Sequence, residues 1–197
     1  AGLEMLARRV GDRDDARELL AQTQDAQHHL HRLYEEVRDY AAPLRLHRQP
    51  IALSEVVERA WEHLAGERSQ RQAQLVQAKA DSQCWGDPVA LGQVFRNLLE
   101  NSLHAARDPV EIRVAWESRV CDGQEGICVI LEDNGPGLTA EQAAHVFDPF
   151  YTTKVRGTGL GMAICRRIIE EHGGQIAVEP SNGCGARISI LLPRSQP

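Results

Sequence analysis

Four short motifs in a fixed order between residues 97 and 161 constrain the fold of this chain more than any other feature. They are NLLEN at 97–101, DNGPGL at 133–138, FDPFYTTK at 147–154 and GTGLG at 157–161. Each alone is weak evidence, because short glycine patterns often arise by chance. In this order, however, a polar helix, a strand-end turn and a glycine-rich helix start can together build one nucleotide pocket.

Composition narrows the class of protein. A length of 197 residues allows one large domain or two small ones. The net charge of −6 argues against binding to nucleic acid, which usually requires a basic face. No apolar run approaches the roughly 18–20 residues of a membrane span, and no signal peptide is evident. We therefore expect a cytoplasmic chain.

The cysteines argue against a zinc site and a disulfide framework. There are five, they are scattered, and none stands in CxxC spacing. Cys128 and Cys165 fall in apolar runs, which is typical of small core residues.

A heptad pattern predicts one long helix near the start of the chain. Apolar or small residues recur at spacings of four and three, namely Leu19, Thr23, Ala26, Leu30, Leu33, Val37 and Tyr40. Asp14 or Asp15 can cap its start and Pro43 forbids its continuation, so we expect about 27 residues of helix.

A shorter helix is expected before the long one. Leu3, Leu6 and Val10 mark it, with a turn at residues 11–12. The two form a hairpin with unequal arms, which predicts a fragment that dimerises into a four-helix bundle. We place this truncated hairpin at residues 1–48 and a second domain at 49–197.

The second domain is predicted to be α+β, an open mixed α/β sandwich with helices covering one face of the sheet. Asp87 followed by Pro88 predicts a helix N-terminus, and the strand at 127–131 is apolar on both faces, which indicates a central position. Helices are expected at 54–71, 88–107 and 158–171; a connector at 50–53; a polar loop at 122–126; and strands at 74–78, 83–85, 110–116, 127–132, 175–178 and 186–192.

On the helix at 88–107, Asn97, Asn101 and His104 share one face. They could form a plain solvated face. Alternatively, the amide oxygen of Asn101 could bind Mg²⁺, a hard ion that accepts one protein oxygen beside phosphates and waters.

Asp133 stands at the end of the central strand, where open α/β sheets place ligand groups. Gly135 and Gly137 would let the backbone approach a flat ring closely. A DNGPG segment is often only a turn, but after a buried strand we interpret Asp133 as an acceptor for the edge of adenine.

The glycine run opens a helix, whose free N–H groups favour phosphate. A dinucleotide-binding interpretation fails, because the preceding FDPFYTTK segment is no buried strand. No GxxxxGK[ST] occurs, which excludes a P-loop.

The four segments resemble the N, G1, F and G2 boxes of the bacterial sensor histidine kinases, within the gyrase, chaperone and mismatch-repair ATPase superfamily. The turn at Gly183 and Gly185 is similar to the last glycine box, and the hairpin resembles the dimerisation and phosphotransfer domain. The short spacing between FDPFYTTK and GTGLG looks most like the nitrogen- and oxygen-sensing subgroup. This resemblance implies a Bergerat-type fold that binds ATP and Mg²⁺.

The resemblance also implies roles for individual residues. Asn101 matches the Mg²⁺ ligand, Asn97 the residue that assists phosphoryl transfer, and Asp133 the carboxylate that accepts the adenine amino group. Residues 145–158 match a mobile ATP lid anchored by Phe147 and Phe150. The remaining residues expected at the nucleotide are His104, Ala105, Gly135, Gly137, Leu138, Thr153, Lys154, Gly157, Thr158, Gly159, Leu160 and Gly161.

The chain departs from the family pattern in three ways. His104 stands where many members have a basic residue, and Ala186 replaces the usual Thr or Ser. None of the eight histidines fits the phosphoacceptor pattern of a histidine followed by an acidic residue and then a proline. His28, His29 and His31 lie in the middle of the long helix, so we expect the acceptor upstream of residue 1.

The resemblance thus implies a histidine kinase that transfers the ATP γ-phosphoryl group to that histidine, and then to an aspartate of a response-regulator receiver domain. The alternatives are an ATP-driven conformational clamp, and a nucleotide-binding pseudokinase used only for interaction. Whether the whole protein is anchored in a membrane stays open.

Overall fold

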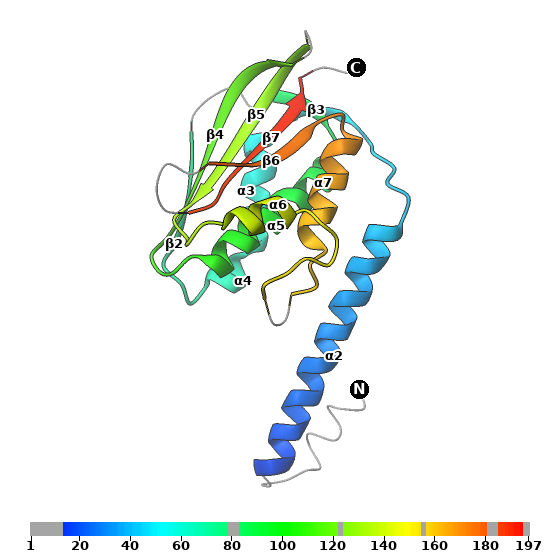
Figure 1. Cartoon of the computed structure of the whole chain (residues 1–197), viewed down its shortest axis with the longest axis vertical. Coiled ribbons are helices and arrows are strands. Elements are labelled where there is room, and N and C mark those ends of the chain that lie inside the picture. The colour runs from blue at the N-terminus through cyan, green and yellow to red at the C-terminus, as the bar shows by residue number, and fades with distance from the viewer. Residues whose placement is uncertain (1–13, 79–82, 122–123, 155–156, 181–184, 195–197) are drawn as a thin grey trace. The chain divides into compact units, whose positions relative to one another are not determined.

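The computed structural model describes residues 14–78, 83–121, 124–154, 157–180 and 185–194. The chain divides into two compact units (Figure 1). One contains Ala1–Ala42 and Thr152–Thr158, and the other contains Pro43–Tyr151 and Gly159–Pro197. The short first helix expected within residues 3–12 lies outside the described residues.

The smaller unit contains the long helix that the heptad pattern predicts. Helix α2 (Asp14–Ala41) has 28 residues, which confirms the prediction of about 27. Part of its apolar stripe faces solvent: Leu19 and Leu30 are each 64% exposed, and Val37 is 41% exposed. Among the described residues no helix is long and apolar enough to cross a membrane.

The larger unit is built on a five-stranded mixed sheet in the order β2-β4-β5-β7-β6. Its strands are β2 (Ala73–Gln77), β4 (Val110–Cys121), β5 (Gln124–Asp133), β6 (Gln175–Glu179) and β7 (Arg187–Pro193). The β2–β4 pair is parallel and the other pairs are antiparallel. Strand β5 lies in the middle, as its two apolar faces predicted.

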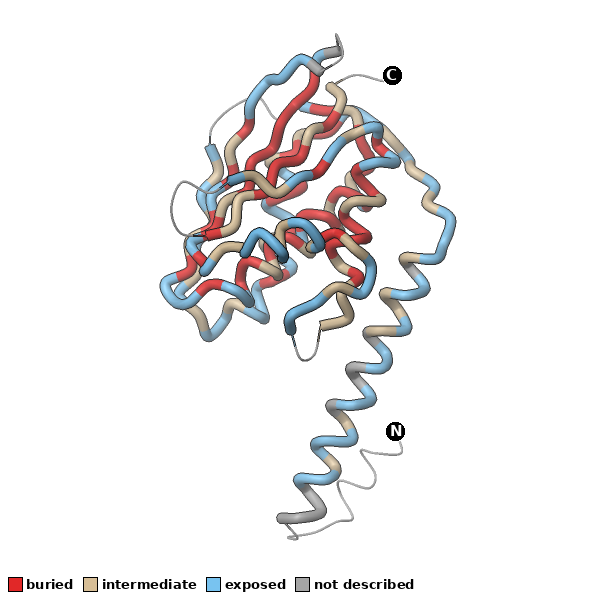
Figure 2. The backbone as a smooth tube through the Cα atoms, viewed as in Figure 1, coloured by how far each residue is buried: buried red, intermediate tan, exposed pale blue. Residues whose placement is uncertain are grey.

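The two faces of the sheet differ in chemistry because side chains alternate along a strand. The face that the helices cover is apolar, and its residues Ile112, Ile127 and Leu131 are almost completely buried. Figure 2 shows that buried residues gather along the sheet strands and the helices of this unit. On the other face, Arg187 pairs with Glu132 and Glu179, both at 3.2 Å. This arrangement confirms the predicted α+β fold with one covered face.

The helices of this unit are α3 (Leu53–His63), α4 (Ala65–Arg68), α5 (Pro88–Ala105), α6 (Ala140–His145) and α7 (Gly161–Glu171) (Figure 1). Helix α5 begins where predicted, because the Asp87 carboxylate accepts hydrogen bonds from the N–H groups of Val89 and Ala90.

Several predicted boundaries were wrong. The single helix expected at 54–71 is two helices, because the backbone leaves the helical range at Leu64, with φ −87° and ψ 10°. The connector at 50–53 instead contributes to a strand, β1 (Gln49–Ala52), which pairs with β3 (Gln83–Gly86). Strand β4 runs to Cys121 and β5 starts at Gln124, so the polar loop is shorter than expected. Helix α6 was not predicted.

Helices α5 and α7 are tied together at three levels. At one end the Asp87 N–H donates to Nε2 of His172, 3.0 Å away, directly after α7. In the middle the Cys165 thiol donates to the carbonyl of Val94 at 3.7 Å. At the other end Asn97 Nδ2 donates to the carbonyl of Gly161 at 3.1 Å. The remaining Asp87 oxygen, Oδ2, accepts the N–H of His47 at 2.7 Å.

Candidate functional site

Asp133 is the centre of a buried hydrogen-bond network at the end of β5. Its side chain is only 6% exposed. Oδ1 accepts the backbone N–H groups of Gly135 at 2.9 Å and Ala186 at 3.1 Å. Oδ2 accepts the hydroxyl of Ser102 at 2.8 Å, so the carboxylate links β5, the approach to β7 and helix α5.

The acceptor capacity of this carboxylate is nearly filled. An ionised carboxylate offers about four lone-pair positions, two on each oxygen. Three of them accept the Gly135, Ala186 and Ser102 donors. Among the described residues no other donor reaches Oδ2 of Asp133, so this oxygen keeps one position for a further donor.

Glycines let the backbone close around this carboxylate. Gly137 and Gly185 have positive φ angles of 77° and 103°, which side-chain-bearing residues rarely adopt. A Cβ atom at Gly185 would lie 1.6 Å from the carbonyl oxygen of Asp133, and one at Gly137 would lie 2.9 Å from the carbonyl oxygen of Gly185. The predicted backbone turns beside Asp133 are therefore present. Leu138 follows them and is half-buried.

The polar stripe of α5 has its predicted register. Asn97 and Asn101 are half-buried, whereas His104 and Ala105 are exposed. The amide of Asn97 donates to Gly161, so the first and fourth motifs meet in space. On the neighbouring helix α7, Cys165 is completely buried, and this burial raises the pKa of its thiol to about 12. This confirms Cys165 as a core residue.

His104 has a neighbour that the sequence did not reveal. Its Nε2 lies 3.9 Å from a carboxylate oxygen of Glu67, and Glu100 is near both. Burial, and secondarily Glu100, raises the pKa of Glu67, while His104 and, less strongly, Arg96 oppose that shift. The side chains of His104 and Glu67 are 50% and 45% exposed, so these residues form a solvated polar face.

The glycine run leads into α7, which begins at Gly161 rather than at the expected residue 158. Gly159 has a φ of 72°, and its carbonyl accepts the N–H of Phe150 at 3.0 Å. Leu160 is completely buried, and Gly161 accepts the Asn97 bond described above.

The two aromatic residues of the third motif differ. Phe147 is buried, and the Arg166 guanidinium lies 4.8 Å from the centre of its ring, so Phe147 anchors this segment as expected. Phe150 is 63% exposed and has a positive φ of 66°, so the expectation that it also anchors the segment was wrong.

Four of the residues expected at the nucleotide belong to the smaller unit, namely Thr153, Lys154, Gly157 and Thr158. Thr153 and Lys154 are exposed. The Gly157 N–H donates to the Lys154 carbonyl at 3.1 Å, and the Thr158 hydroxyl donates to the Glu36 carboxylate of α2.

Ser102 was missed from the sequence. It lies on the buried side of α5 among Leu98, Leu99 and Leu103 and is 4% exposed. A hydroxyl on an apolar helix face needs a partner, because an unsatisfied buried donor costs about 1–3 kcal/mol. That polar interruption was the available signal, although it could not identify Asp133 as the acceptor.

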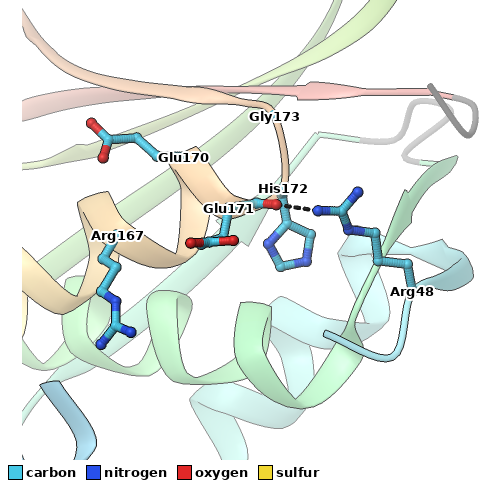
Figure 3. A pocket seen from close by; sticks show the side chains of 6 residues that line it. All are labelled: Arg48, Arg167, Glu170, Glu171, His172 and Gly173. Atoms are coloured by element: carbon cyan, nitrogen blue, oxygen red, sulfur yellow. Dashed lines mark hydrogen bonds between the residues drawn. The ribbon is translucent and has the colours of Figure 1, made fainter. Parts of the chain in front are cut away.

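A shallow pocket of about 370 Å³ lies at the far end of α7 from Gly161 (Figure 3). Within it the Arg48 guanidinium donates to the Glu171 carbonyl. His172 is completely buried, and its two ring nitrogens contact the Asp87 N–H and the Ile168 carbonyl. Burial lowers its pKa, and Nε2 accepts the Asp87 N–H, so His172 serves as a structural hydrogen-bonding residue. The pocket is lined by Arg48, Arg167, Glu170, Glu171, His172 and Gly173.

Comparison with known proteins places this arrangement among ATPases. Residues 86–196 match the family described as histidine kinase-, DNA gyrase B-, and HSP90-like ATPase. The chain is 35% identical over 166 residues to the sensor histidine kinase ZraS of Klebsiella oxytoca, covering 83% of this chain and 35% of that protein. It is 31% identical over 185 residues to the C4-dicarboxylate transport sensor protein DctB of Pseudomonas aeruginosa, covering 91% of this chain and 30% of that protein.

Solved structures agree with this likeness. The catalytic domain of the histidine kinase ThkA superposes with a TM-score of 0.65 at 26% identity, covering 75% of this chain and 97% of that domain. ThkA in complex with the response regulator TrrA has a TM-score of 0.76 at 22% identity, covering 98% of this chain and 56% of ThkA, which shows likeness of fold. The chain spans about a third of the length of the curated relatives named above.

Proposed function

The chain belongs to the histidine kinase-, DNA gyrase B-, and HSP90-like ATPase family, and from that premise we propose that it is the ATP-binding catalytic part of a sensor histidine kinase. The observation that carries the proposal is the buried Asp133 carboxylate with one acceptor position left on Oδ2. The exocyclic amino group of adenine would fill that position. Guanine presents a carbonyl oxygen there, and two facing acceptors would leave a buried group unpaired.

The phosphates would lie towards the glycine run and the start of α7. The hydrogen bond from Asn97 to Gly161 brings the amide stripe of α5 next to the start of α7 within the larger unit. The half-buried amide of Asn101 on the same stripe is a hard oxygen donor that fits Mg²⁺. When bound, that ion would neutralise the charge of the phosphates. Gly135, Gly137, Leu138, Gly159, Leu160 and Gly161 would contact the nucleotide, and His104 and Ala105 would contribute at its margin.

In this proposal Asn97 assists transfer of the γ-phosphoryl group to a histidine outside these 197 residues, and an aspartate of a response-regulator receiver domain then receives it. Residues 1–48 would belong to a dimerisation hairpin and residues 49–197 to the catalytic domain. The exposed stripe of α2, including Leu19 and Leu30, supports a homodimer because an apolar heptad face needs a partner. We place the chain in the cytoplasm.

Asp133→Asn tests the proposal. Asn can keep Oδ1 as the acceptor for Gly135 and Ala186 but replaces Oδ2 with an NH₂ group, so it preserves the fold and reverses the hydrogen-bond pattern offered to the base. In calorimetric titrations with Mg²⁺ present, the unsubstituted chain should bind ATP about 10- to 100-fold more tightly than GTP. Asp133→Asn should lose most of that preference.

Glu132→Gln is the matched control. It makes the same charge change one residue earlier, but Glu132 pairs with Arg187 on the other face of the sheet. Its ATP affinity should equal that of the unsubstituted chain. Equal affinities for ATP and GTP in the unsubstituted chain, or unchanged ATP binding in Asp133→Asn, would contradict the proposed role of Asp133.

A further inference from the structure

The contact between Ser102 and Asp133 joins two parts of the candidate site. Ser102 directly follows Asn101 on α5, whereas Asp133 ends β5, 31 residues later in the sequence. Both side chains are at least nine-tenths buried, and the Ser102 hydroxyl lies 2.8 Å from Oδ2. Oδ1 is held by two backbone N–H groups, and Ser102 is the side-chain donor among the described residues that acts on Oδ2, the oxygen with the open acceptor position.

We propose that Ser102 is a positioning residue that sets selectivity for purines carrying an amino group at position 6. Its hydroxyl occupies one of the two lone-pair positions of Oδ2 and so leaves a single direction from which Asp133 can accept. The inference rests on the proposed function, since it assigns the base end of that nucleotide pocket.

Removal of the hydroxyl would change this geometry. Oδ2 would then have two open lone-pair positions, and a water molecule could enter the space left by the hydroxyl and compete for either one. The amino group of adenine would lose the fixed acceptor that makes its hydrogen bond favourable, because preorganised groups bind with less loss of entropy. Ser102 therefore acts on the base through Asp133.

The measurement compares two nucleotides that differ only at position 6. ATP carries the amino group, and purine riboside 5′-triphosphate carries a hydrogen there. The ratio of their dissociation constants isolates the contribution of the amino group, which should be about 10- to 100-fold in the unsubstituted 197-residue chain. A defect that merely loosens the fold would weaken both nucleotides equally and leave this ratio unchanged.

Three substitutions at Ser102 separate the hydroxyl from the volume it fills. Ser102→Ala removes the hydroxyl, and Ser102→Cys keeps the volume but replaces it with a weak donor. Both should reduce the ratio about 5- to 10-fold. Ser102→Thr retains a hydroxyl and should keep the ratio of the unsubstituted chain.

Ser189→Ala is the matched control. Ser189 is also buried, and its hydroxyl bonds to a carboxylate, that of Glu179, on the other face of the sheet. In Ser189→Ala the ratio of the two nucleotide dissociation constants should equal that of the unsubstituted chain. The assignment of Ser102 is overturned if Ser102→Ala keeps the ratio of dissociation constants of the unsubstituted chain. It is also overturned if Ser102→Thr lowers that ratio as much as Ser102→Ala does. Failure of the unsubstituted chain to bind ATP would instead overturn the proposed function.

Discussion

At the scale of single residues, the surroundings of a glycine decide what a side chain there would cost. At Gly66 in α4, no described atom apart from its chain neighbours and the adjoining helix backbone lies within 4 Å of the position a Cβ would take. Gly173 is equally open but has a φ of 74°. Gly185 combines a φ of 103° with the 1.6 Å overlap against Asp133. The three positions thus separate helix propensity, backbone conformation and steric overlap.

Alanine at these three glycines should affect the free energy of unfolding in a graded way. Gly66→Ala should stabilise the chain by about 0.5–1 kcal/mol, because alanine is the better helix former. Gly173→Ala should cost about 1–2 kcal/mol from its left-handed backbone alone. Gly185→Ala should cost about 3 kcal/mol or more, because the backbone around Asp133 must move. Urea unfolding measures the free energy of unfolding of all three variants. If Gly185→Ala is no more destabilising than Gly173→Ala, the steric overlap with Asp133 does not contribute as expected.

Sequence reasoning singled out Asp133 but not the groups that hold its carboxylate in place. Asp133 stood out because it follows a buried strand and precedes two glycines, all within one short segment. The donors Ser102 and Ala186 lie far from it along the chain, and only the packing of α5 and β7 against β5 brings them within 3.1 Å. Such contacts leave no periodic pattern in a single sequence.

At the scale of elements, boundaries set by local hydrogen bonds were the predictable ones. Asp87 and Pro88 fix the start of α5 through side-chain and ring geometry within one turn. The break after α3 has no such local signal, because Leu64 continues the helical spacing of the buried residues Val57 and Ala60 while its backbone leaves the helical range. Helix α6 carries a capping box between Thr139 and Gln142, a local signal that was overlooked.

Asp87→Ala should destabilise the larger unit more than an ordinary loss of a helix cap. The carboxylate accepts the N–H groups of His47, Val89 and Ala90, so its removal leaves three donors to find other partners. We expect a loss of about 2–3 kcal/mol in the free energy of unfolding. Urea titration followed by circular dichroism measures it.

Thr139→Ala provides the comparison, because Thr139 caps the exposed helix α6 and should cost only about 1 kcal/mol. Equal losses of unfolding free energy in Asp87→Ala and Thr139→Ala would contradict the role of the His47 contact.

Burial would raise the pKa of Asp87, but the three N–H donors outweigh it and lower the pKa below 3.8. The contribution of the carboxylate should therefore be complete above that value and be lost as the pH falls below it.

At the scale of the whole molecule, the chain should bind ATP without phosphorylating itself. None of its eight histidines is followed directly by an acidic residue, and His31 on α2 is solvent-exposed. Transfer requires an acceptor held in line with the γ-phosphate. Incubation with γ-labelled ATP and Mg²⁺ should therefore leave the chain without acid-labile label, while calorimetry on the same sample detects binding. Acid-labile label that His28→Ala, His29→Ala or His31→Ala removes would contradict this expectation.

The three hydrogen bonds between α5 with its cap and α7 hold these two helices together as one packed pair. Helix α7 is about 16 Å long, and it is braced against α5 through His172 at one end and Gly161 at the other. Because both ends of α7 are hydrogen-bonded to α5 or its cap, the two helices can shift relative to each other only if one of these bonds breaks. A displacement of Asp87, which also accepts the N–H of His47, would therefore carry Gly161 with it.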